Sequence, residues 1–143
     1  NTGKRLVKAP KVYVRDSGLV HALLGIETED TLLGHPIAGA SYEAFALENL
    51  ISAAHQATPY FYRTAAGAEI DLLLVWPDGT RWAVEVKRSL SPKPARGFFD
   101  ACRDLLPARK FVVHPGTDRW SLGDEVEAVG LDALCAELMG KTG

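Results

Sequence analysis

The chain has 143 residues, of which 47% are hydrophobic and 24% are charged, and this length is enough for one domain with a substantial core. The net charge of −2 lacks the overall basic character of a DNA-binding protein. No apolar run is long enough to span a membrane and no signal segment is visible, while Cys102 and Cys135 stand in no metal-binding or paired motif. We therefore expect a cytoplasmic protein with reduced thiols.

The first part of the chain predicts only short elements. The sequence has no initiator Met and no G-x-x-x-x-G-K-[ST] phosphate loop. We expect residues 1–10 to be the remnant of a preceding module or linker, and residues 11–143 to form one domain. Lys11 to Val14 is predicted to be a strand, and Gly18 to Leu24 a brief helix ending at Gly25.

The clearest helical pattern runs from Ser41 to about His55. At about 100° per residue, Glu43 lies near the centre of the apolar arc, whose other members are Ala46, Leu47, Leu50, Ile51 and Ala54. An acid in the first turn also complements the helix dipole, but this effect does not explain a place within the apolar arc. We therefore predict that Glu43 faces the sheet on which the helix packs.

Residues 70–76 and 81–87 predict an antiparallel hairpin of two apolar strands. Between them, Pro77, Asp78 and Gly79 favour a type I turn followed by a glycine in the left-handed region, which makes a three-residue loop. The strands then pair in the order Leu73 with Ala83, Asp71 with Glu85, and Glu69 with Lys87. With a two-residue loop, Asp71 would instead face the side opposite to Glu85.

The three-residue loop places Asp71 directly across from Glu85, where like charges repel, so we expect a compensating group. Lys87 shares a face with Glu85 because side chains alternate along a strand. Two carboxylates suit a hard cation such as Mg²⁺ or Mn²⁺, and the lysine can orient or deprotonate a water or hold a phosphate. The alternative is a solvated polar face with an ordinary ion pair between Glu69 and Lys87, but the apolar strands around the acids favour a site.

The remaining elements indicate an α/β fold with helices packed on a mixed central sheet. An amphipathic helix is predicted over Ala95 to Leu106, strands over Lys110 to His114 and Val126 to Val129, and a closing helix over Leu131 to Met139. Arg63, before the hairpin, can reach a phosphate or pair with Glu69 or Asp71.

Basic residues are concentrated in one part of the chain. Residues 81–110 hold eight bases against three acids, whereas residues 16–80 hold a single base, Arg63. A basic strip beside the proposed site can follow a phosphate backbone, although basic runs are more often simply solvated.

A helix glutamate, an aspartate on one strand and Glu-x-Lys on the next resemble the motif of the PD-(D/E)xK nuclease superfamily. The matching residues are Glu43, Asp71 and Glu85-Val86-Lys87, with Ile70 where the motif name has Pro. The resemblance implies a restriction-endonuclease-like fold with a mixed central sheet flanked by helices. It also implies that Asp71, Glu85 and Glu43 bind Mg²⁺ or Mn²⁺ and that Lys87 handles the attacking water.

A second resemblance, more specific, is to the uncharacterised domain that follows the AAA-type ATPase module in many bacterial and archaeal proteins. It rests on residues 11–19, 39–50, 62–71 and 84–87, in the same order along the chain; Tyr62 stands where many relatives have Trp. The resemblance implies work coupled to an N-terminal ATPase module, and hence that this sequence is the C-terminal part of a longer protein.

These observations lead to functional hypotheses of different classes. The first is a Mg²⁺-dependent nuclease-like domain that acts on nucleic acid, with Arg63 and Arg88 as phosphate contacts. The second is a non-catalytic accessory domain that binds DNA or a protein partner for the ATPase half. The third is a regulatory or oligomerisation module that keeps only a relic of the site. No self-complementary surface can be recognised, so no oligomeric state is predicted.

Overall fold

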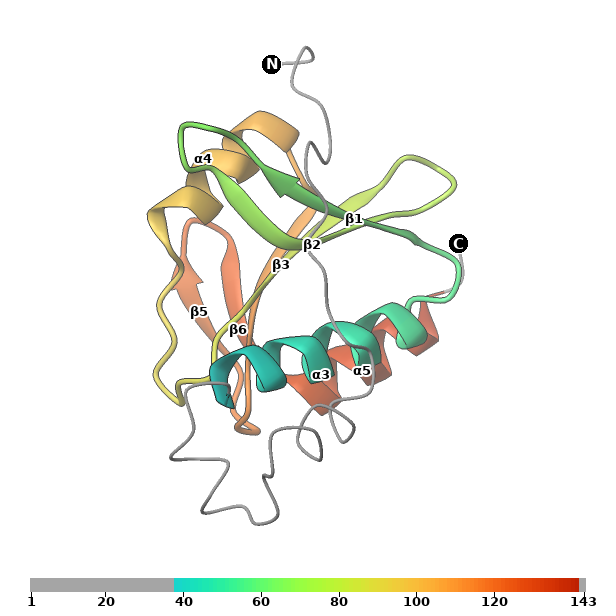
Figure 1. Cartoon of the computed structure of the whole chain (residues 1–143). Coiled ribbons are helices and arrows are strands. Elements are labelled where there is room, and N and C mark those ends of the chain that lie inside the picture. Colours follow the sequence, from blue (N-terminus) through green and yellow to red (C-terminus); the bar gives the residue numbers. More distant parts are fainter. Residues whose placement is uncertain (1–37, 142–143) are drawn as a thin grey trace, which may run out of the picture.

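The computed structural model describes residues 38–141 (Figure 1); the strand and helix expected before residue 25 lie outside this range. The elements, in chain order, are α3 (Ala38–Ala53), β1 (Thr58–Arg63), β2 (Glu69–Val75), β3 (Arg81–Val86), α4 (Arg96–Leu105), β4 (Arg109–His114), β5 (Trp120–Gly123), β6 (Val126–Gly130) and α5 (Leu131–Gly140). Each helix and strand predicted from the sequence within this range is present, with ends shifted by at most three residues.

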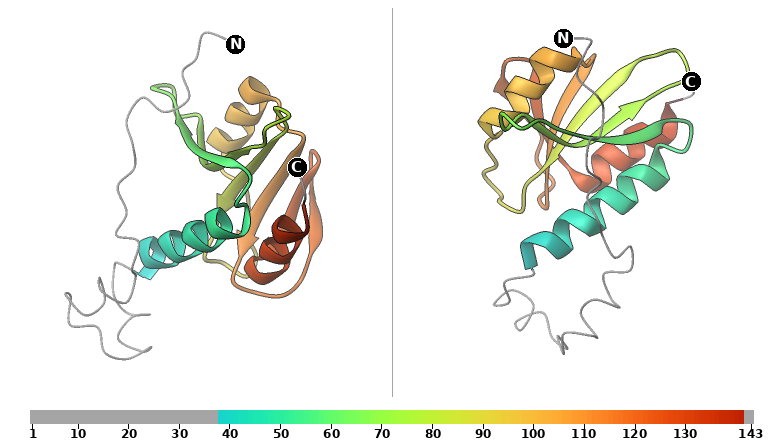
Figure 2. Two further views of the ribbon diagram at one scale, coloured as in Figure 1. Left: turned by 90° about the vertical axis from the view of Figure 1, so that its right-hand side faces the viewer. Right: turned by 45° about the horizontal axis from the view of Figure 1, so that its top comes forward.

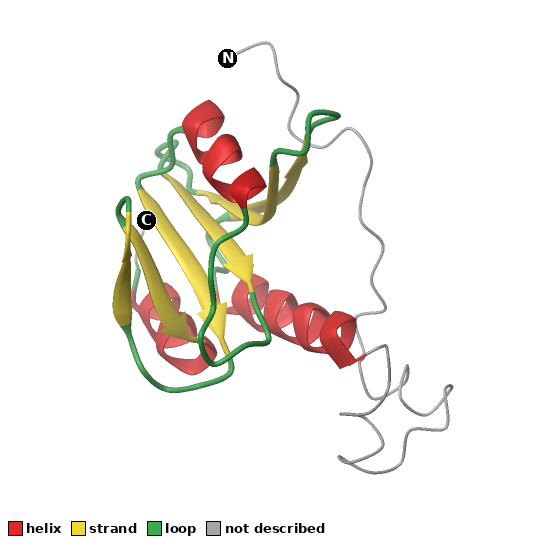
Figure 3. Ribbon diagram, turned by 90° about the vertical axis from the view of Figure 1, so that its left-hand side faces the viewer, coloured by secondary structure: helices red, strands yellow, loops and turns green. Residues whose placement is uncertain are grey.

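The six strands form one sheet in the order β1-β2-β3-β4-β6-β5. The pairs β1–β2, β2–β3 and β5–β6 are antiparallel, and β3–β4 and β4–β6 are parallel. Helices α3 and α5 lie side by side on one face, as both views in Figure 2 show, and α4 covers the other face (Figure 3). The predicted α/β class with a mixed, helix-flanked sheet is confirmed.

The hairpin between β2 and β3 has the predicted register from its turn to the pair Leu72–Val84, whereas the predicted pairs of Asp71 with Glu85 and of Glu69 with Lys87 do not form because the strands separate there. Leu73 lies opposite Ala83. At the turn, the Gly79 N–H donates to the Trp76 carbonyl over 2.9 Å, and Gly79 has a φ of 86°, the left-handed conformation that glycine adopts without strain. The three-residue loop is therefore confirmed.

The sequence did not indicate β1 or β5 as strands. Both are edge strands of the sheet. Because an edge strand has one partner and much exposed surface, it needs no apolar run: β1 begins with the exposed pair Thr58 and Pro59, and β5 has only four residues.

The core is divided between the two faces of the sheet. The cluster under α3 and α5 includes Leu72, Leu74, Val84 and Phe111, and the cluster under α4 includes Ile70, Leu73, Ala83 and Val112. Alternation would place Ile70 on the same face as Leu72. Ile70 instead lies on the α4 face, because the β1–β2 register shifts between two pairs: Tyr60 lies opposite Leu73, but Tyr62 lies opposite Ile70. The bulge on β2 comprises Asp71 and Leu72.

Four charged side chains join β4, β6 and α5 near the start of β4. Arg109 pairs with Glu127 over 2.8 Å and with Glu137, while Arg119 pairs with the same two glutamates over 2.7 and 3.0 Å. The Arg109 guanidinium also lies 4.9 Å from the centroid of Trp82. We call Arg109, Arg119, Glu127 and Glu137 the ion-pair cluster. It holds α5 against the sheet at the end opposite to the carboxyl end of β3.

Candidate functional site

Strands β2 and β3 separate at Asp71. Their pairing ends at Leu72–Val84, whereas β3 continues along β4 to Val86. The Trp76 N–H donates to the Thr80 carbonyl, and in an antiparallel ladder hydrogen-bonded pairs recur at every second residue. A continuous ladder would therefore join Val86 to the carbonyl of Ile70.

The carboxylate of Asp71 takes the place of that carbonyl. The Val86 N–H donates to Asp71 Oδ2 over 2.9 Å. Because the bulge turns β2 at this point, the Asp71 side chain lies between the two strands at the level of the sheet. It is half-buried there.

Glu85 is a buried carboxylate, 8% exposed, on the face covered by α4. Its Oε1 lies 3.3 Å from Lys87 Nζ, and its Oε2 accepts a hydrogen bond of 3.1 Å from the backbone N–H of Ala95. Ala95 is the N-cap of α4, where the helix dipole favours negative charge. The lysine and the helix end supply the compensation that a buried carboxylate needs.

Lys87 directly follows β3 and is held there by its backbone, whose N–H donates to the Val113 carbonyl over 2.9 Å. Its side chain is 36% exposed, so the ammonium meets both Glu85 and solvent. The alternative interpretation, an ion pair of Lys87 with Glu69, is wrong: Lys87 pairs with Glu85. Glu69 faces Arg63 on β1 and pairs with it over 3.2 Å, because β2 has already left β3 at that residue.

Asp71 thus bonds the backbone of Val86, the residue between Glu85 and Lys87, where β2 and β3 diverge. Glu43 is half-buried on α3, which packs on the opposite face of the sheet from α4. Its place among the metal ligands therefore stays a prediction, as does the metal itself.

The donor set is compatible with magnesium. Mg²⁺ is usually held by one or two carboxylates, with waters and substrate phosphates as further ligands; Asp71 and Glu85 supply that number. In the part of the chain from residue 38 to 141, no three His, Cys, Asp or Glu side chains are grouped so as to hold a metal ion.

Two buried groups near the site have structural roles. His114 is 1% exposed; its Nδ1 accepts from the Gly116 N–H over 3.0 Å and its Nε2 lies 2.8 Å from the Asp118 carbonyl, so the proton is on Nε2. Burial raises the pKa of the Cys102 thiol to about 12, which leaves it protonated at neutral pH and without a nucleophilic role.

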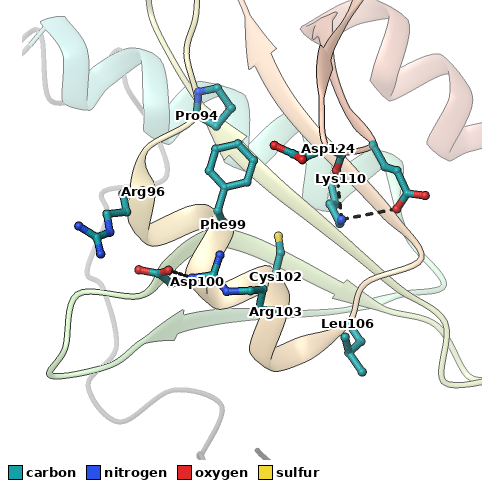
Figure 4. A pocket seen from close by; sticks show the side chains of 10 residues that line it. Pro94, Arg96, Phe99, Asp100, Cys102, Arg103, Leu106, Lys110 and Asp124 are labelled. Carbon is teal, nitrogen blue, oxygen red and sulfur yellow. Dashed lines mark hydrogen bonds and ion pairs between the residues drawn. The ribbon is translucent and has the colours of Figure 1, made fainter.

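A groove of about 990 Å³ runs beside α4 (Figure 4). Its walls come from α4, β4 and the β5–β6 turn, and its lining residues are Pro94, Arg96, Phe99, Asp100, Cys102, Arg103, Leu106, Lys110, Asp124 and Glu125. No sequence pattern indicated this groove, because its sides are distant in the chain. No helix among residues 38–141 has the length and apolar character needed to cross a membrane.

Residues 38–134 match the family described as "Domain of unknown function (DUF4143)". The chain is 41% identical over 134 residues to an uncharacterised protein of Mycobacterium bovis and to one of Mycobacterium tuberculosis. Each match covers 94% of this chain and 30% of the relative, so the chain spans less than a third of these proteins.

Two solved structures show a low overall similarity to this chain. One is a chain of the Thermococcus gammatolerans assembly of McrB AAA+ hexamers with bound McrC, at a TM-score of 0.48 and 10% identity over 71% of this chain and 32% of that one. The other is protein VC1899 of Vibrio cholerae, at a TM-score of 0.41 and 15% identity over 78% and 34%. Likenesses this low carry no functional argument.

Proposed function

We propose that this chain, which belongs to the DUF4143 family of domains of unknown function, is a magnesium-dependent nuclease-like domain that acts on the phosphodiester bonds of nucleic acids. The observation that carries the proposal is the Glu85–Lys87 ion pair next to Val86, whose backbone N–H is held by the Asp71 carboxylate where β2 and β3 diverge. A buried carboxylate is costly, and Glu85 is paired with an ammonium that reaches solvent.

The three side chains have two roles in the proposal. Asp71 and Glu85 hold the cation. When bound, the cation activates a water and offsets the negative charge that develops on the phosphate. Lys87 orients the water or a phosphate oxygen, and its pairing with Glu85 fixes the ammonium next to the reacting atoms.

The hydrogen bonds of Glu85 explain how the site is positioned. Oε2 is tied to the Ala95 N–H, so the carboxylate is held between β3 and the start of α4 rather than free to rotate. A rigid ligand loses little conformational entropy when a cation binds.

The test begins with a calorimetric Mn²⁺ titration of the chain and of Asp71→Asn. Asparagine keeps an acceptor oxygen for the Val86 N–H, so the sheet is preserved while a negative charge is removed. Glu85→Gln is the equivalent change at the second acid. We expect saturable binding by the parent chain that each variant loses; a folded parent chain that binds no Mn²⁺ contradicts the proposal.

Cleavage is then measured on labelled DNA and RNA with Mg²⁺ and with Mn²⁺. Lys87→Ala should abolish cleavage without unfolding the domain, because the lysine backbone stays bonded to Val113. Phe45→Ala, at an exposed residue of α3, is the control that should cleave normally. Undiminished cleavage by Lys87→Ala would overturn the role given to the lysine.

A second candidate is a non-catalytic accessory domain that binds DNA or a protein partner and serves an N-terminal AAA-type ATPase module. Its support is the length of the relatives, of which 30% corresponds to this chain. Such a domain would bind its partner equally well after Asp71→Asn and Glu85→Gln. The two candidates are distinguished by measuring partner binding in a full-length relative that carries both changes. If that variant still binds its partner, and binding does not depend on metal, the accessory role is favoured.

A further inference from the structure

The segment between β3 and α4 forms a closed loop whose conformation is set at several points. The Glu85–Ala95 hydrogen bond joins its two ends. Within the loop, the Ser91 N–H donates to Ser89 Oγ over 3.0 Å, and Pro92 is buried. Leu90 extends from the loop to the turn after β4, where its side chain lies next to Gly116. The loop is thus built onto the carboxyl ends of β3 and β4.

The charged residues of this loop and of the first turn of α4 are all basic. Residues 86–99 contain four bases and no acid. One of them, Lys87, pairs with Glu85. The other three are exposed, and none of them takes part in an ion pair within the described residues: Arg88, Lys93 and Arg96. Arg96 and Phe99 both line the groove beside α4, and Figure 4 shows their side chains directed away from each other.

The other bases of the 81–110 strip are engaged by the protein itself. Arg81 donates to the Leu105 carbonyl, Arg103 pairs with Asp100, Arg109 belongs to the ion-pair cluster, and Lys110 pairs with Glu125 over 3.7 Å. The structure therefore divides the strip into bases that interact within the domain and three bases next in sequence to, or in the loop beside, the candidate site.

We propose that Arg88, Lys93 and Arg96 form the surface on which this domain holds the sugar–phosphate backbone of a nucleic acid. We call these residues the phosphate-binding loop residues. That the anion is a nucleic acid rests on the proposed function. The argument for the surface is electrostatic. Like charges close together on one segment repel each other, and binding of an anionic backbone relieves that repulsion and releases counterions.

The loop geometry connects this surface to the site. Ala95, which bonds Glu85, is the direct neighbour of Arg96, and Arg88 directly follows Lys87. A backbone lying on the loop passes the point where β2 and β3 diverge. Successive phosphates of one strand are about 3.4 Å apart along a duplex axis, so cations on one short loop fall within a few nucleotides of each other. Arg63 on β1 already pairs with Glu69 on β2, so it is a weaker candidate for a phosphate contact than Arg88.

The test measures binding without cleavage. Fluorescence anisotropy with labelled single-stranded and duplex DNA of about 20 nucleotides is followed in EDTA from about 50 to 200 mM KCl. The variant is Arg88→Gln/Lys93→Gln/Arg96→Gln. The matched control is Ser52→Glu/Ala133→Glu/Ala136→Glu, at exposed positions of α3 and α5, which lowers the net charge by the same amount on the other face.

For duplex DNA, the slope of log K against log[salt] is negative, and we expect its magnitude to decrease by about 2.7 in the loop variant, since each phosphate contact contributes about 0.9. Affinity near 100 mM salt should fall roughly tenfold or more. The control should keep the parent slope. Absence of nucleic-acid binding by the parent chain, or an equal slope in the loop variant and the parent, overturns the inference.

The outcome also separates this inference from the proposed function. Binding that depends on the phosphate-binding loop residues, in a chain that never cleaves with Mg²⁺ or Mn²⁺, supports the surface and contradicts the nuclease role. Lys87-dependent cleavage by a chain whose loop variant keeps the parent salt slope supports the nuclease role and overturns the surface.

Discussion

Asp71 Oδ2 accepts the hydrogen bond of the Val86 backbone N–H at 2.9 Å, in the position where a regular ladder would present the carbonyl of Ile70. A side chain thus completes the sheet at the point where its strands part. The same carboxylate is one of the proposed metal ligands, so folding and function can be separated only by a substitution that changes the charge and keeps the acceptor.

This relationship predicts different effects for two substitutions of Asp71. Asp71→Ala leaves the Val86 N–H without its acceptor and should lower the free energy of unfolding by about 1–3 kcal/mol. Asp71→Asn keeps an acceptor oxygen and should lower it by less than about 1 kcal/mol. Urea unfolding followed by circular dichroism measures both. Equal losses in the two variants would mean that this hydrogen bond does not stabilise the fold.

Gly97 in the first turn of α4 is predicted to be intolerant of any side chain. A Cβ there would lie 2.2 Å from the carbonyl oxygen of Gly67 in the β1–β2 turn. Gly97→Ala should therefore destabilise the domain by about 1–3 kcal/mol and shift the start of α4, including the Ala95 N–H that holds Glu85. We expect weaker Mn²⁺ binding along with the lower stability.

The control for that prediction is Gly140→Ala in α5, where a Cβ would meet nothing within 4 Å. Alanine is better than glycine in a helix by up to about 1 kcal/mol, so this variant should be as stable as the parent or slightly more stable. If Gly97→Ala behaves like Gly140→Ala, the close approach of the two backbones is not as the structure has it.

The β5–β6 turn carries backbone strain that one substitution should relieve. Asp124 and Glu125 have φ values of 53° and 63°, a conformation that favours glycine or asparagine. The Glu125 side chain is 90% exposed, so its 3.7 Å ion pair with Lys110 adds little. Glu125→Gly should stabilise the domain by about 0.5–1 kcal/mol, measured as a higher midpoint of thermal unfolding.

The comparison variant for the turn is Glu125→Ala, which removes the same ion pair and keeps a Cβ. It should give no gain in stability. An equal gain in both variants would assign the effect to the lost charge instead of the backbone conformation.

The ion-pair cluster predicts acid sensitivity. Hydrogen bonds from Arg119 and Arg109 hold the pKa of Glu127 below its usual value of 4.5 in the folded state. The stabilisation is therefore complete above the ordinary carboxyl pKa and is lost as the pH falls through the lower, folded-state pKa. Between about pH 5 and pH 3, the parent should lose stability more steeply than Glu127→Gln. Parallel curves from urea unfolding at several pH values would contradict this reading.

The sequence alone was sufficient for the elements with strong local signals. The three-residue turn at Pro77, Asp78 and Gly79 set the register of the central hairpin because backbone conformation at a tight turn depends on the residues in it. Apolar periodicity located α3, α4 and α5 to within a few residues. Since Lys87 is two residues from Glu85 on one strand, their shared face also followed from alternation.

Tertiary structure alone decided how these parts meet. The bulge that turns Asp71 between the strands depends on the pairing of β2 with an edge strand that has no strong pattern of its own. The buried charge of Glu85 is compensated by the backbone N–H of Ala95, ten residues away. Every residue except proline has such a group, so the sequence does not indicate which one will bind the carboxylate. Likewise, the sequence does not distinguish among the eight bases of residues 81–110. In the folded domain some of them form ion pairs, whereas Arg88, Lys93 and Arg96 form none within the described residues. Such long-range partners are set by packing, which local sequence patterns do not encode.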